Sequence, residues 1–118
     1  MKILIVDDNK ETTSMLSKFL NYKGHQIAVS NDAMEGLSII KKEKYDVILL
    51  DINMPIISGF NFIDILATDE TLKDQNIFIF SGQSFHDIHI KNLLRKDGVN
   101  GVLKKPMKLD EILTAITC

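Results

Sequence analysis

Residues 3–9 read Ile-Leu-Ile-Val-Asp-Asp-Asn, and residues 47–51 follow the same pattern as Val-Ile-Leu-Leu-Asp. Four branched apolar residues in succession are typical of a strand buried on both faces, as in a parallel sheet. Both runs end in acids, and open α/β sheets bind their ligands just beyond the carboxyl ends of their strands. If the two strands are neighbours, Asp7, Asp8 and Asp51 converge in one pocket.

Such a cluster of carboxylates is electrostatically unfavourable by itself. Two unit charges about 4 Å apart repel by roughly 4 kcal/mol at an effective dielectric constant of about 20. A fold that keeps three of them together needs a cation, and a hard divalent ion with oxygen ligands fits best. The sequence therefore predicts a metal site at this edge of the sheet.

Strand and helix patterns alternate along the rest of the chain. The predicted strands are 3–6, 27–29, 47–50, 77–80 and 102–103. Apolar residues recur at helical spacing between and after them: Met15, Leu16, Phe19 and Leu20; Ala33, Leu37 and Ile40; Gly59, Phe62, Ile63, Leu66 and Ala67; Ile90, Leu93 and Leu94; Leu109, Ile112, Leu113 and Ile116. This alternation predicts a parallel sheet with helices on both faces. The first, third and fourth strands are the most apolar and are expected at its centre, with the second at an edge.

Two local signals mark helix ends. Gly24 stands where the first helix is expected to end in a left-handed cap. Asp32, with Glu35 three residues later, resembles a capping box that opens the second helix.

Length and composition limit the class of protein. The 118 residues suit a single domain, 45% of them are hydrophobic and 25% charged, and the net charge is −2. That charge gives no electrostatic reason to expect nucleic acid or a membrane surface as a partner. The sequence has no apolar stretch long enough to span a membrane, and a strand pattern begins too early to leave room for a signal peptide. With Cys118 as its one cysteine, a reducing cytoplasm is the expected location.

The residues that follow four of the strands form a chemical set. They are Asp7 and Asp8, then Asp51, then Ser81, and finally Lys104 and Lys105 before Pro106. A carboxylate can act as the nucleophile toward a phosphoryl group, giving an acyl phosphate. A divalent ion, a lysine and a hydroxyl then stabilise charge on the phosphoryl oxygens. The set therefore predicts phosphoryl transfer.

In these motifs the chain resembles the receiver domains of two-component response regulators, over essentially all of residues 1–118. The matching fragments are Ile3–Asn9, Val47–Pro55 with Gly59 following, Phe80–Gly82 and Leu103–Pro106. Each fragment alone is weak, but their order and spacing on five strand–helix units are specific. The resemblance implies one flavodoxin-like domain, a doubly wound (βα)5 fold with a five-stranded parallel sheet in the order 2-1-3-4-5.

The resemblance also implies a set of metal ligands. Asp8 and Asp51 would bind Mg²⁺ directly, the backbone carbonyl of Asn53 would be a third ligand, and Asp7 would act through a metal-bound water. Mg²⁺ suits this set because it favours few protein ligands together with waters and phosphoryl oxygens.

The remaining implied roles concern the phosphoryl group itself. Asp51 would accept it from the phosphohistidine of a histidine kinase or phosphotransfer protein. Lys105, before a cis proline bond, and Ser81 would contact its oxygens, with Gly82 leaving an entry path beside Ser81. Asn53 and Gln83 occupy the positions that in the family tune dephosphorylation.

Val102 departs from the family pattern. The family often has tyrosine or phenylalanine at this switch position, and its ring swings inward on activation. Because valine has no ring to swing, we expect the segment after Ser81 to carry the conformational change, with Phe85 as the nearest substitute aromatic.

The leading hypothesis is a signalling switch that binds a downstream protein differently once Asp51 is phosphorylated. It would be a monomer or weak dimer, and it would catalyse only its own phosphorylation and dephosphorylation. Lys91, Arg95 and Lys108, on the family's usual output face, favour an acidic partner. A stand-alone receiver and a fragment of a longer regulator both remain open.

Three alternatives compete with this hypothesis. A degenerate receiver would bind partners without phosphorylation, which Val102 alone favours. An aspartate-nucleophile phosphohydrolase needs Asp-x-Asp after the first strand, where this chain has Asp7-Asp8-Asn9, and Asp110-Glu111 are typical of first-turn helix acids. A flavodoxin-like cofactor binder would present its phosphate-binding loop where the acids repel anions.

Overall fold

The computed structural model describes residues 1–52, 54, 58–81, 88–104 and 108–117. Strands and helices alternate in these residues: β1 (Lys2–Val6), α1 (Lys10–Tyr22), β2 (Gln26–Ser30), α2 (Ala33–Lys42), β3 (Val47–Asp51), α3 (Gly59–Thr68), the 3-10 helix η1 (Leu72–Asp74), β4 (Ile77–Ser81), α4 (Ile88–Leu94), β5 (Val99–Lys104) and α5 (Leu109–Thr117). Across the described helices, no segment combines the length and apolarity that crossing a membrane requires.

The five strands form one parallel sheet in the order β2-β1-β3-β4-β5, which confirms the predicted fold. Ile3 of β1 lies in register with Ile27 of β2 on one side and Val47 of β3 on the other. The strands predicted as central are central, and β2 lies at an edge. β2 and β5 are longer than predicted because pairing with a neighbour extends them into polar and glycine residues, and in β5 beyond these to the isolated Val99.

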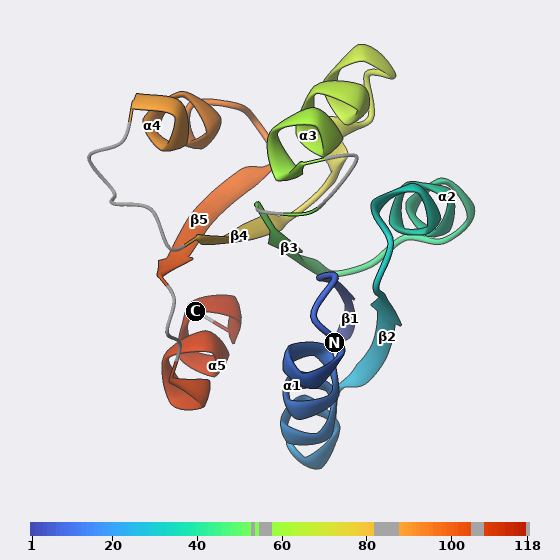
Figure 1. Ribbon diagram of the computed structural model, residues 1–118, viewed down its shortest axis with the longest axis vertical. Helices are drawn as coiled ribbons and strands as arrows, with labels where there is room; N and C mark the ends of the chain where they lie inside the picture. Colours follow the sequence, from blue (N-terminus) through green and yellow to red (C-terminus); the bar gives the residue numbers. More distant parts are fainter. Residues whose placement is uncertain (53, 55–57, 82–87, 105–107, 118) are drawn as a thin grey trace.

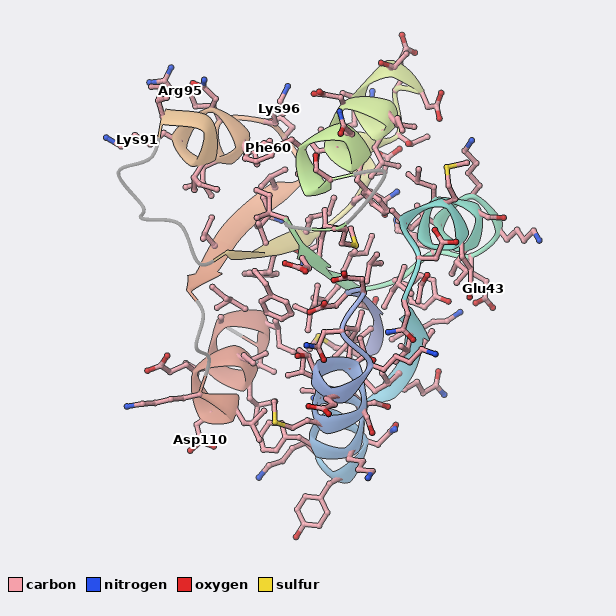
Figure 2. The ribbon with its side chains drawn as sticks, in the orientation of Figure 1. Glu43, Phe60, Lys91, Arg95, Lys96 and Asp110 are labelled. Atoms are coloured by element: carbon pink, nitrogen blue, oxygen red, sulfur yellow. The ribbon has the colours of Figure 1, made fainter. Side chains whose placement is uncertain are left out.

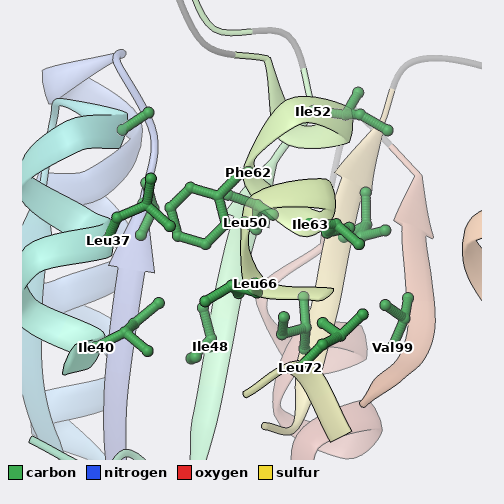
Figure 3. Packing of buried hydrophobic residues seen from close by; sticks show 14 of the residues in the cluster. Leu37, Ile40, Ile48, Leu50, Ile52, Phe62, Ile63, Leu66, Leu72 and Val99 are labelled. Carbon is green, nitrogen blue, oxygen red and sulfur yellow. The ribbon is translucent and has the colours of Figure 1, made fainter. Parts of the chain in front are cut away.

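Helices cover both faces of the sheet, with α1 and α5 on one face and α2, α3 and α4 on the other (Figure 1). Successive side chains of each strand point to opposite faces. Leu4 and Val6 of β1 therefore join the core under α2 and α3, whereas Ile3 and Ile5 join the core under α1 and α5. Figure 3 shows Phe62 of α3 packed between α2 and β3 in the first of these cores.

Most members of the predicted helix stripes are buried or partly buried, but three are exposed. Met15, Ala67 and Leu94 are exposed, so these three members of the apolar stripes do not face the core. Each is the immediate neighbour of a buried leucine, and adjacent helix residues differ by about 100° around the axis. The apolar stripe that touches the sheet is therefore narrower than the sequence pattern indicates.

The helix ends follow their local signals with one difference. Gly24 has φ +93°, the left-handed cap that the sequence predicts. Asp32 caps α2 by accepting a hydrogen bond from the backbone N–H of Met34 at 2.9 Å, not from Glu35. Within the described residues, the reciprocal capping box lies at α3, between Ser58 and Asn61.

A small polar cluster ties β1 to the start of β3 at the amino end of the sheet. Lys2 Nζ lies 3.1 Å from a Glu43 carboxylate oxygen, and the Tyr45 hydroxyl donates a hydrogen bond to Glu43 at 3.0 Å. The hydrogen bond from Lys2 lowers the pKa of Glu43, and burial raises the pKa of Tyr45. Glu43 lies beside α2 in Figure 2, and its contacts connect β1 with the segment between α2 and β3.

Candidate functional site

Three carboxylates meet at the carboxyl edge of the sheet. β1 and β3 are paired, with Val6 opposite Leu50, so the residues that follow them emerge side by side. Carboxylate oxygens of Asp7, Asp8 and Asp51 lie within 4.8 Å of one another. The convergence predicted from the two apolar runs is therefore present.

The three acids differ in their exposure. Asp7 is 0% exposed and Asp51 2%, whereas Asp8 is exposed. An ion or a phosphoryl group would reach the two buried carboxylates from the side on which Asp8 meets solvent. The donor set consists of carboxylate oxygens, which are hard ligands that Mg²⁺ and Ca²⁺ prefer over thiolate or imidazole. Among the described residues it is the one acidic, histidine or cysteine cluster with this geometry.

The start of α1 fixes the orientation of Asp7. The backbone N–H of Asn9 donates to Asp7 Oδ1 at 2.9 Å. Asn9 is also the N-cap of α1, and its own side-chain oxygen accepts from the backbone N–H of Thr12 at 3.0 Å. On the other side, the Asp7 backbone N–H donates to the carbonyl of Ser30 at 3.1 Å. Asp7 is thus held from both neighbouring segments.

A close approach of α3 holds the chain after Asp51. The backbone N–H of Gly59 donates to the carbonyl of Ile52 at 2.9 Å. A Cβ atom on Gly59 would lie 2.6 Å from Ile52 Cα and 3.0 Å from the Asp51 carbonyl oxygen. Only a glycine allows this approach, so Gly59 helps to position the backbone that carries Asp51.

The other predicted site residues are only partly described. Ser81 ends β4, and its backbone lies in register with Lys104 at the end of β5, so β4 and β5 end on the same edge as the acids. Asn53, Gln83 and Lys105 lie outside the described residues, as does Phe85. Val102 pairs with Ile79 and packs, partly buried, against the core under α2, α3 and α4.

Sequence reasoning missed one polar residue at this edge. Asn31 follows β2, and its side-chain nitrogen donates to the backbone carbonyl of Asp7 at 2.8 Å and to Thr13 Oγ1 at 3.0 Å. Asn31 lies just past the carboxyl end of a strand, as the three acids do. The apolar run of β2 ends at Val29, two residues before Asn31, and asparagine is common in turns, so the sequence pattern does not single it out.

The strand order and the acidic cluster are those expected of a receiver domain. Comparison with known proteins leads to the same class. The family model for the response regulator receiver domain matches residues 3–117. The chain therefore belongs to the response regulator receiver domain family.

Curated relatives include two transcriptional regulators. The chain is 30% identical over 116 residues to the transcriptional regulatory protein HprR of Escherichia coli K12, covering 98% of this chain and 50% of HprR. It is 32% identical over 117 residues to the cell cycle transcriptional regulator CtrA of Caulobacter vibrioides, covering 98% of this chain and 48% of CtrA. The chain thus spans about half the length of these relatives. A probable chemotaxis protein CheY of Rhizobium etli is 29% identical, with 98% of this chain and 89% of that protein covered.

Solved structures show the same fold. The chemotaxis protein CheY4 of Vibrio cholerae superposes with a TM-score of 0.85 at 28% identity, covering 98% of this chain and 94% of CheY4. The receiver domain of the sensor histidine kinase PA1611 of Pseudomonas aeruginosa, with a magnesium ion in its active site cleft, superposes with a TM-score of 0.80 at 21% identity, covering 98% of this chain and 93% of that one.

Proposed function

We propose that this chain is a phosphoacceptor switch of a two-component system, with Asp51 as the residue that is phosphorylated. The observation that carries the proposal is the convergence of Asp7, Asp8 and Asp51 within 4.8 Å at the ends of paired strands. Membership of the receiver family supports the same conclusion. The phosphoryl group would come from the phosphohistidine of a histidine kinase or phosphotransfer protein.

The proposed reaction is a direct displacement at phosphorus. A carboxylate oxygen of Asp51 attacks the phosphorus atom, an O–P bond forms, and the N–P bond to the donor histidine breaks with its electron pair staying on the imidazole nitrogen. Asp51 is nearly buried at the end of β3, so its carboxylate approaches from a fixed direction. Positioning of this kind supplies much of the acceleration in phosphoryl transfer.

The carboxylates fit a magnesium site around this nucleophile. Asp8 and Asp51 would hold Mg²⁺ directly, with the Asn53 carbonyl, and Asp7 through a water. The ion, when bound, neutralises charge on the carboxylates and the phosphoryl oxygens. Without it, the three negative charges would repel an incoming phosphoryl group, because like charges a few ångströms apart interact by several kcal/mol at low dielectric.

Further residues are assigned to the phosphoryl group and its lifetime. Lys105 and Ser81 would contact the phosphoryl oxygens, and Asn53 and Gln83 would tune hydrolysis of the acyl phosphate. Because Val102 has no ring to swing, the segment after β4 would carry the change that a downstream protein detects.

The output partner is proposed to be an acidic protein surface. Lys91 on α4 and Arg95 just after it are exposed and project from the molecule (Figure 2). Lys108, before α5, is also exposed. In the typical setting of the family, the cytoplasm, the chain would act as a monomer or weak dimer through such contacts. It would act as a regulator that catalyses only its own phosphorylation and dephosphorylation.

Phosphoryl uptake from a small donor tests the proposal. We expect the protein to gain the mass of one phosphoryl group when it is incubated with acetyl phosphate and Mg²⁺, and Asp51→Asn to gain none. Chelation of Mg²⁺ should also abolish the gain. Mass spectrometry of the intact protein measures it.

Asp64→Asn is the matched control, because Asp64 is exposed on α3, away from the acidic edge. It should take up the phosphoryl group like the wild type. Absence of uptake by the wild type would overturn the proposal and favour a receiver that acts without phosphorylation. Steady hydrolysis of unrelated phosphate esters would favour a phosphohydrolase.

A further inference from the structure

We propose that Asn31 is a positioning residue that preorganises the acidic edge for its metal ion. The inference rests on the proposed function, because it concerns the same site. Asn31 touches none of the reacting atoms and acts through the backbone of Asp7.

The Asn31 side chain joins three segments. Its nitrogen donates to the carbonyl of Asp7 at the end of β1, 24 residues away, and to Thr13 Oγ1 in α1. Thr13 is 2% exposed, and its hydroxyl donates to the carbonyl of Lys10 at 3.1 Å. The hydroxyl is therefore left as an acceptor toward Asn31. One carboxamide thus connects the loop after β2, the end of β1 and the first turns of α1.

Chemistry settles which end of the carboxamide faces Asp7. A backbone carbonyl can only accept a hydrogen bond, so the group opposite it must be the NH₂. The Thr13 hydroxyl, already donating to Lys10, also needs a donor. Both contacts use the same nitrogen, whose two hydrogens match the two acceptors. Aspartate at position 31 would present oxygens to a carbonyl and add a fourth negative charge.

The turn that carries Asn31 is itself fixed on both sides. Ser30, before it, is 1% exposed and accepts the backbone N–H of Asp7 through its carbonyl. The Ser30 hydroxyl donates to the carbonyl of Asp32, after it, at 2.6 Å. Asn31 therefore reaches Asp7 from a backbone that has little freedom to move.

The hydrogen bond from Asn31 to the Asp7 carbonyl also restricts the backbone of Asp8. The Asp7 carbonyl belongs to the peptide unit that leads into Asp8, so a hydrogen bond to its oxygen fixes the plane from which Asp8 continues. Asp8 is exposed, and its carboxylate lies within 4.8 Å of the two buried carboxylates. Without the bond from Asn31, this plane is freer to rotate, and the Asp8 carboxylate relaxes away from Asp7 and Asp51. Binding of the ion would then have to bring the Asp8 carboxylate back toward Asp7 and Asp51, which lowers the affinity for the ion.

Mg²⁺ affinity, measured without any phosphodonor, tests the role directly. Residues that orient metal ligands typically change metal affinity by about 10- to 100-fold when they are removed. We expect Asn31→Ala to weaken Mg²⁺ binding within this range in calorimetric titrations. In metal-free protein, the Asn9 N–H, which donates to Asp7 Oδ1, should also exchange with solvent faster.

The phosphorylation reaction should separate binding from chemistry. For Asn31→Ala, the Mg²⁺ concentration that gives half of the maximal rate with acetyl phosphate should rise by the same factor as the dissociation constant. The rate at saturating Mg²⁺ should fall much less. Thr13→Val removes the second acceptor of Asn31 at nearly constant shape, so its effect should be smaller and should not add to that of Asn31→Ala.

Asn76→Ala is the matched control. The Asn76 side chain also donates to a backbone carbonyl, that of Asp46, at 3.1 Å and across 30 residues, but at the opposite end of the sheet. It should lower the unfolding midpoint and leave Mg²⁺ affinity unchanged. Equal losses of Mg²⁺ affinity in both variants would reduce Asn31 to a structural residue and overturn the inference.

The role of Asn31 and the proposed function can be refuted separately. A wild type that binds Mg²⁺ and is phosphorylated on Asp51, beside an Asn31→Ala variant with unchanged Mg²⁺ affinity, would refute the role of Asn31 alone. A wild type that neither binds Mg²⁺ nor accepts a phosphoryl group would refute the proposed function, and the role of Asn31 with it.

Discussion

At the scale of single residues, Gly98 is a position where a close contact, in addition to the backbone conformation, excludes any larger residue. Gly98 has φ +96°, and a Cβ atom there would lie 1.9 Å from the carbonyl oxygen of Leu72. Its own carbonyl accepts the backbone N–H of Ile77 at 2.8 Å. Gly24 has a similar φ of +93°, but a Cβ atom there would meet nothing within 4 Å. Substituting Gly24 therefore tests backbone strain alone, whereas substituting Gly98 tests backbone strain together with a steric clash.

We predict that Gly98→Ala destabilises the protein much more than Gly24→Ala. A left-handed conformation costs a non-glycine residue about 1–2 kcal/mol, which is the whole expected effect at Gly24. Overpacking adds about 1–3 kcal/mol at Gly98, because η1 must move. The free energies of unfolding from urea titrations of the two variants measure the difference. Equal losses would show that the contact with Leu72 relaxes freely.

At the scale of elements, the chain ends two helices with the same cap but different residues. After α1, the N–H groups of Gly24 and His25 donate to the carbonyls of Asn21 and Leu20. After α3, the N–H groups of Glu70 and Thr71 donate in the same way to the carbonyls of Ala67 and Leu66. Both are Schellman caps, which place their central residue in the left-handed region. Glu70, with φ +61°, occupies a position that glycine adopts without strain.

We predict that Glu70→Gly stabilises the protein, by up to about 1.6 kcal/mol. Relief of left-handed strain contributes about 1–2 kcal/mol, and the greater freedom of glycine in the unfolded chain offsets about 0.4–1 kcal/mol. Thermal or urea unfolding measures the net gain. Glu70→Ala is the control, since it removes the carboxylate but keeps the strain, and it should give no gain. A gain of the same size from alanine would assign the effect to charge.

At the scale of the whole molecule, folding itself assembles the acidic edge. Asp7 and Asp51 lie 44 residues apart in the chain and meet only because β1 and β3 pair. The repulsion between Asp51 and the neighbouring pair Asp7 and Asp8 is thus absent from the unfolded chain and opposes folding. A cation that binds only the folded arrangement should reverse this effect.

We predict that Mg²⁺ raises the stability of the protein and that Asp8→Asn abolishes the gain. A ligand present at 100 times its dissociation constant stabilises by about 2.7 kcal/mol. In metal-free solution, Asp8→Asn should instead be at least as stable as the wild type, because it removes one of three repelling charges. Thermal unfolding with Mg²⁺ and with a chelator measures both, and Asp64→Asn should behave like the wild type. A Mg²⁺ effect that survives in Asp8→Asn would place the ion elsewhere.

Sequence alone specified the strands, their parallel arrangement and the acids at two of their ends, because side-chain periodicity and burial are local properties of the chain. It misjudged the flanks of the helix stripes at Met15, Ala67 and Leu94, where the width of the contact with the sheet decides burial. The tertiary structure decided the rest. The approach of Gly98 to Leu72 and the bond from Asn31 to Asp7 join segments more than 20 residues apart, and no local pattern records which segments will meet. The sequence therefore named the acids, and the packing of β1 between β2 and β3 determined how they are held.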